Sequence, residues 1–315
     1  MRLIGAAAVA VVIGSMTVLA GAVPPVVAGP PAAAPGSHAA PAAAASASRP
    51  GRPDLKSNVA LVFDEARGQA LYAKNPDRVV PIASITKLMT AMVILDARLP
   101  MDETIPIDRE DVDRLKHTRS RLEVGAQVTR GDLLWVALMS SENRAAAALA
   151  RTYPGGTAAC VAAMNLKALQ VGMMQARFAD ASGLSSGNVA SAEDLSRLVR
   201  VAAEYPEIRR FSTARSHTVR LSRGRVLEFH NSNGLVSNKA WTIGLSKTGY
   251  LDAAGRCLVM QAEIAARPVI IVLLDSWGKY TRLGDANRIR KWMEAAASAA
   301  GPVAATGPGA PTRAR

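Results

Sequence analysis

The stretch that decides the fold is RVVPIASITKLMTAMVILD, residues 78–96, in which Lys87 is the only ionisable residue between Arg78 and Asp96. The positions around Lys87 are uncharged and mostly apolar. A helix that is apolar around nearly its whole circumference lies inside a protein. The segment therefore predicts a buried helix over residues 84–97, with a lysine inside it.

Burial disfavours the charged form of an amine, so we expect a lowered pKa for Lys87 and a neutral amine near about pH 7. Ser84 lies three residues earlier on the same helix face, where its hydroxyl can give a proton to that amine while attacking a carbonyl. It also follows Pro81 in the first turn, where unpaired backbone N–H groups can hold an oxyanion. The plain alternative is a core lysine that extends to the surface beside an ordinary serine.

Outward from this helix, the hydrophobic period changes between strand and helix spacing. Strands are predicted at 58–63, 69–73, 216–221, 226–230, 241–247, 257–264 and 268–274. Helices are predicted at 129–140, 142–151, 157–170, 192–203 and 284–297, the fourth capped by Ser191 with Asp194. Strands at both ends with helices between them predict an α+β fold: a mostly antiparallel sheet built from N- and C-terminal strands, with an inserted helical lobe and a cleft where they join.

The two ends of the chain differ in composition from the middle. Residues 1–28 carry Arg2, an apolar run and small-residue cleavage sites, so we expect a signal peptide, with an uncleaved membrane anchor as the alternative. Residues 29–54 are Ala/Pro-rich and predict a disordered linker, and 300–315 predict a disordered tail. The catalytic domain is therefore expected over 55–299.

The net charge of +13 suits a negatively charged partner, and after export the candidates are wall polymers and anionic lipid headgroups. Nucleic acid is excluded by the compartment and by the lack of a basic run or an aromatic-interleaved basic motif. The four histidines show no metal-ligand spacing, so we expect neither metal nor cofactor. Cys160 and Cys257 lie among apolar neighbours, which favours free thiols over a disulfide.

Two further motifs carry chemistry. Ser141-Glu142-Asn143 falls between two predicted helices, and Lys247-Thr248-Gly249, followed by Tyr250, ends a predicted strand. A cation, a hydroxyl and a glycine there can bind an extended peptide through charge, a hydrogen bond and close backbone approach. S-x-x-K, S-x-N and K-T-G in this order are typical of penicillin-binding proteins and serine β-lactamases.

The strings ASITKLMTAMV, LMSSENRAAAALAR, SKTGYLDAAGRCLVM and VLLDSWGKYTRLGDANRIRKW resemble the D-alanyl-D-alanine endopeptidase branch, the penicillin-binding protein 7 type, of the low-molecular-mass enzymes in peptidase family S11. The resemblance covers residues 55–295. It implies a periplasmic serine peptidase with a serine β-lactamase/DD-peptidase-like fold. The implied substrates are peptidoglycan peptides with D-alanyl to meso-diaminopimelyl cross-links, and the implied covalent inhibitors are β-lactams.

The same resemblance implies roles for the matching residues. Ser84 corresponds to the acylated nucleophile and Lys87 to its general base. Ser141 and Asn143 correspond to the residues that relay protons and hold the substrate amide. The substrate carboxylate is received by Lys247 and Thr248, with Gly249 beside them, and the backbone N–H groups of Ser84 and Tyr250 form the oxyanion hole. The adjacent Ser140 has no Asn in register and is expected to pack or cap.

Four other interpretations of the function compete with that of a serine endopeptidase. A β-lactamase needs a carboxylate that activates the deacylating water. From Asn143 to Ala179 there is no Asp or Glu, and Asp180 is the only acid nearby, which disfavours a β-lactamase. The G-x-S-x-G match at 183–187 could indicate an α/β-hydrolase, but no strand precedes it, and His217 and His230 lie in a hairpin pattern. A loop over 180–188 beside the cleft is expected instead.

A carboxypeptidase of the same family shares the chemistry. It usually adds a second β domain and an amphipathic helix, for which we expect no room after Glu294. A non-catalytic wall-binding scaffold would keep its cellular effect after Ser84→Ala.

Overall fold

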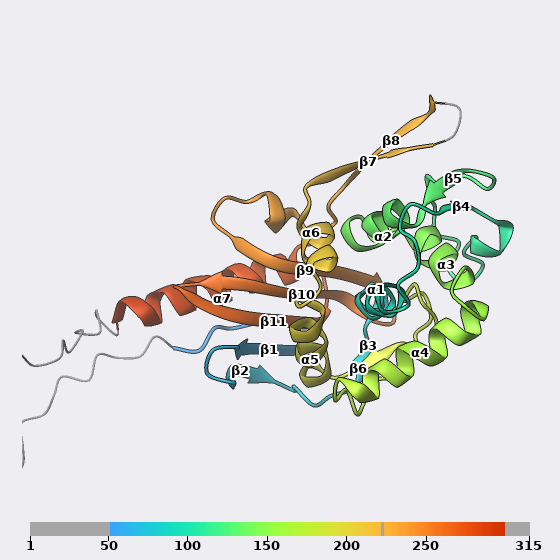
Figure 1. Ribbon diagram of the computed structural model, residues 1–315. Helices are drawn as coiled ribbons and strands as arrows, with labels where there is room; N and C mark the ends of the chain where they lie inside the picture. The colour runs from blue at the N-terminus through green and yellow to red at the C-terminus, as the bar shows by residue number, and fades with distance from the viewer. Residues whose placement is uncertain (1–50, 222–223, 300–315) are drawn as a thin grey trace, which may run out of the picture. The chain divides into compact units, whose positions relative to one another are not determined.

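A five-stranded antiparallel sheet runs through the protein in the strand order β2-β1-β11-β10-β9 (Figure 1). The computed structural model describes residues 51–221 and 224–299. The strands are β1 Val59–Asp64, β2 Gln69–Lys74, β9 Thr242–Leu251, β10 Gly255–Ile264 and β11 Arg267–Ser276. Val59 pairs with Leu274, so strands from the two ends of the sequence meet, and the predicted α+β fold is confirmed.

Side chains alternate between the two faces of this sheet, as the strand period requires. Val59, Leu61 and Val272 face the helical lobe and join its core. Ala60 and Leu273 point to the other face and pack against α7, which runs over Thr281–Ala299. The central strands are buried on both faces, which explains their nearly continuous apolar sequence.

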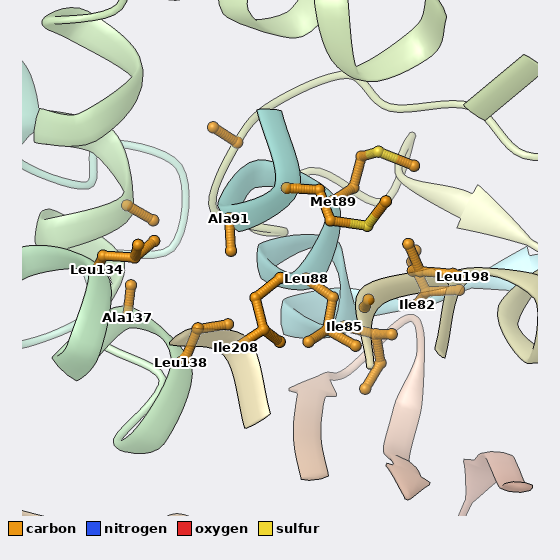
Figure 2. Close-up of a cluster of buried hydrophobic side chains, with 14 of the residues drawn as sticks. Ile82, Ile85, Leu88, Met89, Ala91, Leu134, Ala137, Leu138, Leu198 and Ile208 are labelled. Atoms are coloured by element: carbon orange, nitrogen blue, oxygen red, sulfur yellow. The ribbon is translucent and has the colours of Figure 1, made fainter. Parts of the chain in front are cut away.

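The helical lobe is assembled around α1. Its helices are α1 Thr86–Asp96, α2 Arg130–Met139, α3 Asn143–Arg151, α4 Gly156–Gln170, α5 Ala192–Ala202 and α6 Pro206–Thr213. Figure 2 shows Leu88 and Ala91 of α1 lying among Leu134 and Leu138 of α2 and Ile208 of α6. Because its neighbours surround it, α1 is buried from Thr86 to Ile94, as its sequence predicted.

Short elements complete the lobe and its border with the sheet. They are the ladders β3 Val80–Pro81 with β6 Val189–Ala190, β4 Thr104–Pro106 with β5 Gln127–Thr129 and β7 Ser216–Arg220 with β8 Val226–His230, and the 3-10 turns η1 Ala83–Ile85, η2 Arg109–Asp111 and η4 Gly234–Ser237. The hairpin β7–β8 extends away from the sheet beside α2 (Figure 1). The hairpin pattern around His217 and His230 is thus confirmed.

Several predicted boundaries need correction. The helix predicted from Ser84 begins at Thr86, because Ala83 takes a left-handed conformation (φ 48°) and residues 83–85 form η1. The strand predicted to end at Lys247 continues to Leu251, because backbone pairing with β10 does not depend on apolar side chains. The last helix begins at Thr281 rather than at residue 284.

Other predictions concern caps, thiols and the chain ends. Ser191 accepts a hydrogen bond from the backbone N–H of Asp194, as predicted, but the Asp194 carboxylate accepts from the N–H of Gln175 instead of completing a capping box. Cys160 and Cys257 are buried free thiols. The predicted signal peptide, the predicted linker up to residue 50 and the predicted tail from residue 300 lie outside the described residues. None of the helices in the described part of the chain combines the length and the apolarity that a membrane span needs.

Candidate active site

The amine of Lys87 lies at the centre of the site. Lys87 is 1 % exposed, and its Nζ donates to Ser84 Oγ at 2.8 Å and to Asn143 Oδ1 at 2.7 Å. It also donates to the backbone carbonyl of Ser182. The structure therefore brings together the serine, the lysine and the asparagine that the sequence singled out.

Burial lowers the pKa of Lys87 from 10.5 to about 7, while the nearby carboxylates of Asp180 and Glu142 act to raise it. The desolvation was predictable from the apolar neighbours of Lys87, whereas these two carboxylates come from distant segments of the chain. A lysine with this pKa is neutral in about half the molecules near neutral pH and can accept a proton from the adjacent hydroxyl.

The backbone around Ser84 is held by two glycines. A Cβ on Gly183 would lie 2.1 Å from the carbonyl oxygen of Ala83, and one on Gly249 would lie 3.1 Å from the backbone nitrogen of Ser84. Only glycine allows these approaches. The N–H of Ser84 therefore lies beside β9, next to the residue that precedes Tyr250, where the oxyanion hole was predicted.

The S-x-N motif occupies the connection between α2 and α3. Ser140 caps the end of α2 and donates to the carbonyl of Val136 at 2.7 Å, as expected for a packing or capping residue. Ser141 follows with a positive φ of 64°, which turns the chain sharply. Glu142 then caps α3 by accepting from the N–H of Ala145, and Asn143 is the first residue of that helix.

Lys247 is the second buried lysine, 1 % exposed. Its Nζ donates to Ser141 Oγ and to the carbonyl of Thr248, both at 2.8 Å. Burial holds the pKa of Lys247 well below 10.5, and the positive charges of Lys87 and Arg282 lower it further. Ser141 is thereby tied to the K-T-G strand, and Asn143 is tied to Lys87.

The remaining K-T-G residues differ in exposure. Thr248 is buried, and its hydroxyl donates to Ser232 Oγ at 2.7 Å. The side chain of Tyr250 is 52 % exposed and donates to Asp252. The ring of Tyr250 lies under the Arg256 guanidinium, 4.4 Å from the ring centroid, and the structure leaves only the Tyr250 backbone for the predicted oxyanion hole.

The loop 180–188 lies against the site, as expected. The carboxylate of Asp180 accepts from the backbone N–H groups of Ser182, Gly183 and Ser185. Partial burial acts to raise the pKa of Asp180, yet these hydrogen bonds and that of the Ser182 hydroxyl hold it below its usual value. The ionised Asp180 fixes the Ser182 carbonyl where Lys87 can bond it.

Sequence reasoning missed several of these contacts. The Ser182 carbonyl cannot be found from residue type, since every residue has one. Ser232 and Thr118, which contacts Asn143 Nδ2 at 3.0 Å, belong to no motif. Within residues 51–221 and 224–299, no three His, Cys, Asp or Glu side chains cluster as metal ligands.

A buried amine of near-neutral pKa in contact with a hydroxyl, with two backbone segments meeting beside it, defines a serine hydrolase with a lysine base. The family model described as D-alanyl-D-alanine carboxypeptidase, peptidase S11, matches residues 44–278, and the chain belongs to that family. It is a serine peptidase of the penicillin-binding type.

Individual relatives agree with this family. A D-alanyl-D-alanine endopeptidase of Pseudomonas aeruginosa is 49 % identical over 260 residues, covering 82 % of this chain and 84 % of the relative. The enzyme of the same name from Escherichia coli is 45 % identical, with 79 % and 81 % covered. Among solved structures, the Streptomyces K15 DD-transpeptidase superposes with a TM-score of 0.72 at 26 % identity, covering 77 % of this chain and 98 % of that one.

Proposed function

We propose that this protein is a DD-endopeptidase that hydrolyses D-alanyl to meso-diaminopimelyl cross-links of peptidoglycan through an acyl-enzyme on Ser84. The observation that carries the proposal is the contact of 2.8 Å between the buried Lys87 amine and the Ser84 hydroxyl. Together with the pKa of Lys87 of about 7, this contact supports a nucleophile and its base already in place.

In the acylation step, Ser84 Oγ attacks the D-alanyl carbonyl carbon while its proton passes to neutral Lys87. The backbone N–H groups of Ser84 and Tyr250 stabilise the oxyanion. The C–N bond then breaks, an ester to Ser84 forms, and the leaving amine takes up a proton relayed through Ser141. Water completes hydrolysis by attacking the ester, and the serine regains its proton.

Substrate binding uses the K-T-G strand. In the cross-link, a carboxylate is carried by the carbon attached to the scissile amide nitrogen. Lys247 and Thr248 receive that carboxylate, and Asn143 holds the substrate amide. Gly249 leaves room for an extended peptide beside β9. A bound carboxylate would also favour the protonated form of Lys247.

β-Lactams are expected to acylate the same serine, and the resulting ester is expected to be hydrolysed slowly. Glu142 is occupied as the cap of α3, and Asp180 is engaged by loop N–H groups. Neither carboxylate is free to activate a deacylating water. A long-lived penicillin ester on Ser84 is therefore the expected product.

The endopeptidase activity is favoured over the carboxypeptidase activity by the relatives. Relatives named D-alanyl-D-alanine endopeptidase are 35–49 % identical to this chain, whereas those named carboxypeptidase are 26–29 % identical. The family model itself bears the carboxypeptidase description, so carboxypeptidase is the second candidate and shares every catalytic step.

The proposed substrate requires export. Residues 1–28 support a signal peptide and a periplasmic location. The positive charge of +13 supports peripheral contact with wall polymers or with anionic lipid headgroups.

Digestion of purified sacculi, with separation of the muropeptides, tests the proposal. Loss of cross-linked dimers is expected, whereas loss of terminal D-alanine from monomers would identify a carboxypeptidase. Labelling with a fluorescent penicillin and mapping of the modified peptide should find Ser84. A Ser84→Ala variant that still cleaves sacculi would overturn the proposed mechanism.

A further inference from the structure

A hydrogen-bonded chain of polar groups leads from the surface to the Lys87 amine. Asp113 accepts from the Thr118 hydroxyl at 2.7 Å, Thr118 Oγ1 accepts from Asn143 Nδ2 at 3.0 Å, and Asn143 Oδ1 accepts from Lys87 at 2.7 Å. Asp113 and Thr118 lie on the loop between η2 and β5, outside all three motifs.

The direction of each bond follows from proton counting. Asp113 Oδ1 accepts from the N–H groups of Leu115 and Lys116, and Oδ2 accepts from the N–H and hydroxyl of Thr118. Burial acts to raise the pKa of Asp113, but these hydrogen bonds hold it below its usual value. Asp113 is therefore an acceptor only, and the single hydroxyl proton of Thr118 goes to it.

A hydroxyl that has given away its proton can only accept. Asn143 must then turn its NH2 group toward Thr118 and its oxygen toward Lys87. We propose that Asp113 and Thr118 are positioning residues that fix the amide of Asn143 with its oxygen facing the catalytic lysine. This inference rests on the proposed function, in which Lys87 is the base.

The orientation of this amide affects the protonation of Lys87. The ammonium form can donate to the Asn143 oxygen, whereas an amide NH2 group in that place would repel it and bond the neutral amine. The other charged groups near Lys87 are Asp180 and Glu142, which favour its ammonium form, and Lys247, whose charge opposes it. These three stay unchanged when the amide turns.

Two substitutions disturb the chain in different ways. Thr118→Val removes the hydroxyl and leaves every charge in place. Asp113→Asn is isosteric. With its oxygen in the place of Oδ1 it keeps the two backbone hydrogen bonds of Leu115 and Lys116 and loses only that of Thr118, so its NH2 group is expected to face Thr118. The Thr118 proton would then point to Asn143 and turn that amide around.

The test measures the rate of acylation by a fluorescent penicillin from acidic to basic pH. Asp113→Asn should move the acid-side midpoint down by about one pH unit, because the Lys87 ammonium loses its acceptor, and should lower the plateau rate about tenfold, because an amine of lower pKa is a weaker base. Thr118→Val should move the midpoint in the same direction by a smaller amount, because the Asn143 amide is then no longer held in one orientation. Thr118→Ser should restore the wild-type midpoint. Glu110→Gln, in the preceding turn η2, removes one negative charge as Asp113→Asn does and is the control for lost charge.

A purely structural role of the loop would lower the active fraction without moving the midpoint. Titration of Lys87 by NMR on 13C-labelled lysine, assigned with Lys87→Met, gives the same shift without any catalysis. The inference is wrong if both variants keep the wild-type midpoint in both measurements. Wild-type protein that leaves sacculi uncut while the shift is present would refute the proposed function alone.

Discussion

The site contains two buried lysines, Lys87 on α1 and Lys247 on β9, and they differ in their neighbours. Lys87 lies near Asp180 and Glu142, whose charges counter part of the desolvation and keep its pKa at about 7. Lys247 lies near Lys87 and Arg282, whose charges lower its pKa further. The same side chain is thus prepared as a base in one place and as a receptor for an anion in the other.

The hydrogen bonds of the two lysines support the same distinction between a base and an anion receptor. Lys87 contacts the hydroxyl of Ser84, an amide oxygen and a carbonyl. Lys247 contacts the hydroxyl of Ser141 and a carbonyl, both uncharged. A substrate carboxylate would supply the negative charge that the surroundings of Lys247 lack, so this lysine gains most on binding.

The largest expected effect is the loss of the base. Lys87→Met should reduce the acylation rate by a fluorescent penicillin about 10³- to 10⁴-fold, because no other group accepts the Ser84 proton. Circular dichroism should show a folded protein, since methionine fits an apolar helix. Acylation within about tenfold of wild type would show that Lys87 is not the base.

The next largest expected effect is the loss of stability when either glycine beside Ala83 and Ser84 is replaced by alanine. Gly183→Ala should destabilise by about 3 kcal/mol or more, since its φ is +82° and the new Cβ would lie 2.1 Å from a backbone oxygen. Gly249→Ala should cost about 1–2 kcal/mol, with a nearest contact of 2.9 Å. Urea unfolding measures both values.

Gly68→Ala is the matched control, because Gly68 has a φ of +65° with nothing within 4 Å. It should cost about 1 kcal/mol from backbone strain alone. If Gly183→Ala proved no worse than Gly68→Ala, the close packing of loop 180–188 on the nucleophile segment would be wrong.

The sequence predicted the parts of the site that depend on residue type and spacing. Ser84 and Lys87 lie three residues apart, about one helical turn, and the uncharged sequence around them indicates burial. The fold was predictable because the strand and helix periods are clear at both chain ends. The path of β9 beyond Lys247 was not, since Thr248 and Gly249 carry no apolar period.

Other features depend on tertiary contacts that no local pattern contains. The left-handed Ala83 is held by Gly183, 100 positions away. Asp180 acts on Lys87 through space, and Thr118 is an exposed hydroxyl in an irregular loop. Such residues become visible only once the chain has folded around them.

Lys247→Met tests whether Lys247, unlike Lys87, acts by binding the substrate carboxylate. Affinity for a β-lactam with a free carboxylate should fall about 100-fold, which corresponds to about 3 kcal/mol for a lost buried charge pair. The methyl ester of the same compound should bind nearly as to wild type. Equal losses for acid and ester would mean that Lys247 positions Ser141 and does not bind the carboxylate.

The smallest effect concerns stability and pH. The folded pKa of Lys87 is about 7 and its ordinary value is 10.5, and the pKa of Lys247 is also lowered. Between about pH 7 and pH 10.5, the unfolded chain binds more protons at Lys87 than the folded one, so the free energy of unfolding should rise with pH. Burial raises the pKa of Cys160 and Cys257 to about 12, which opposes the rise once free thiols ionise, near about pH 8.5 and above.

The free energy of unfolding in urea should therefore increase from about pH 7 to about pH 8.5, with Lys87 contributing up to about 1.4 kcal/mol per pH unit and Lys247 acting in the same direction. Lys87→Met and Lys247→Met should each reduce this slope, and the double variant should nearly abolish it. Lys116→Met, at an exposed site, is the control and should leave the slope in place. A slope that survives in the double variant would show that neither amine loses its proton on folding, and the contrast between base and anion receptor would have to be sought in hydrogen bonding alone.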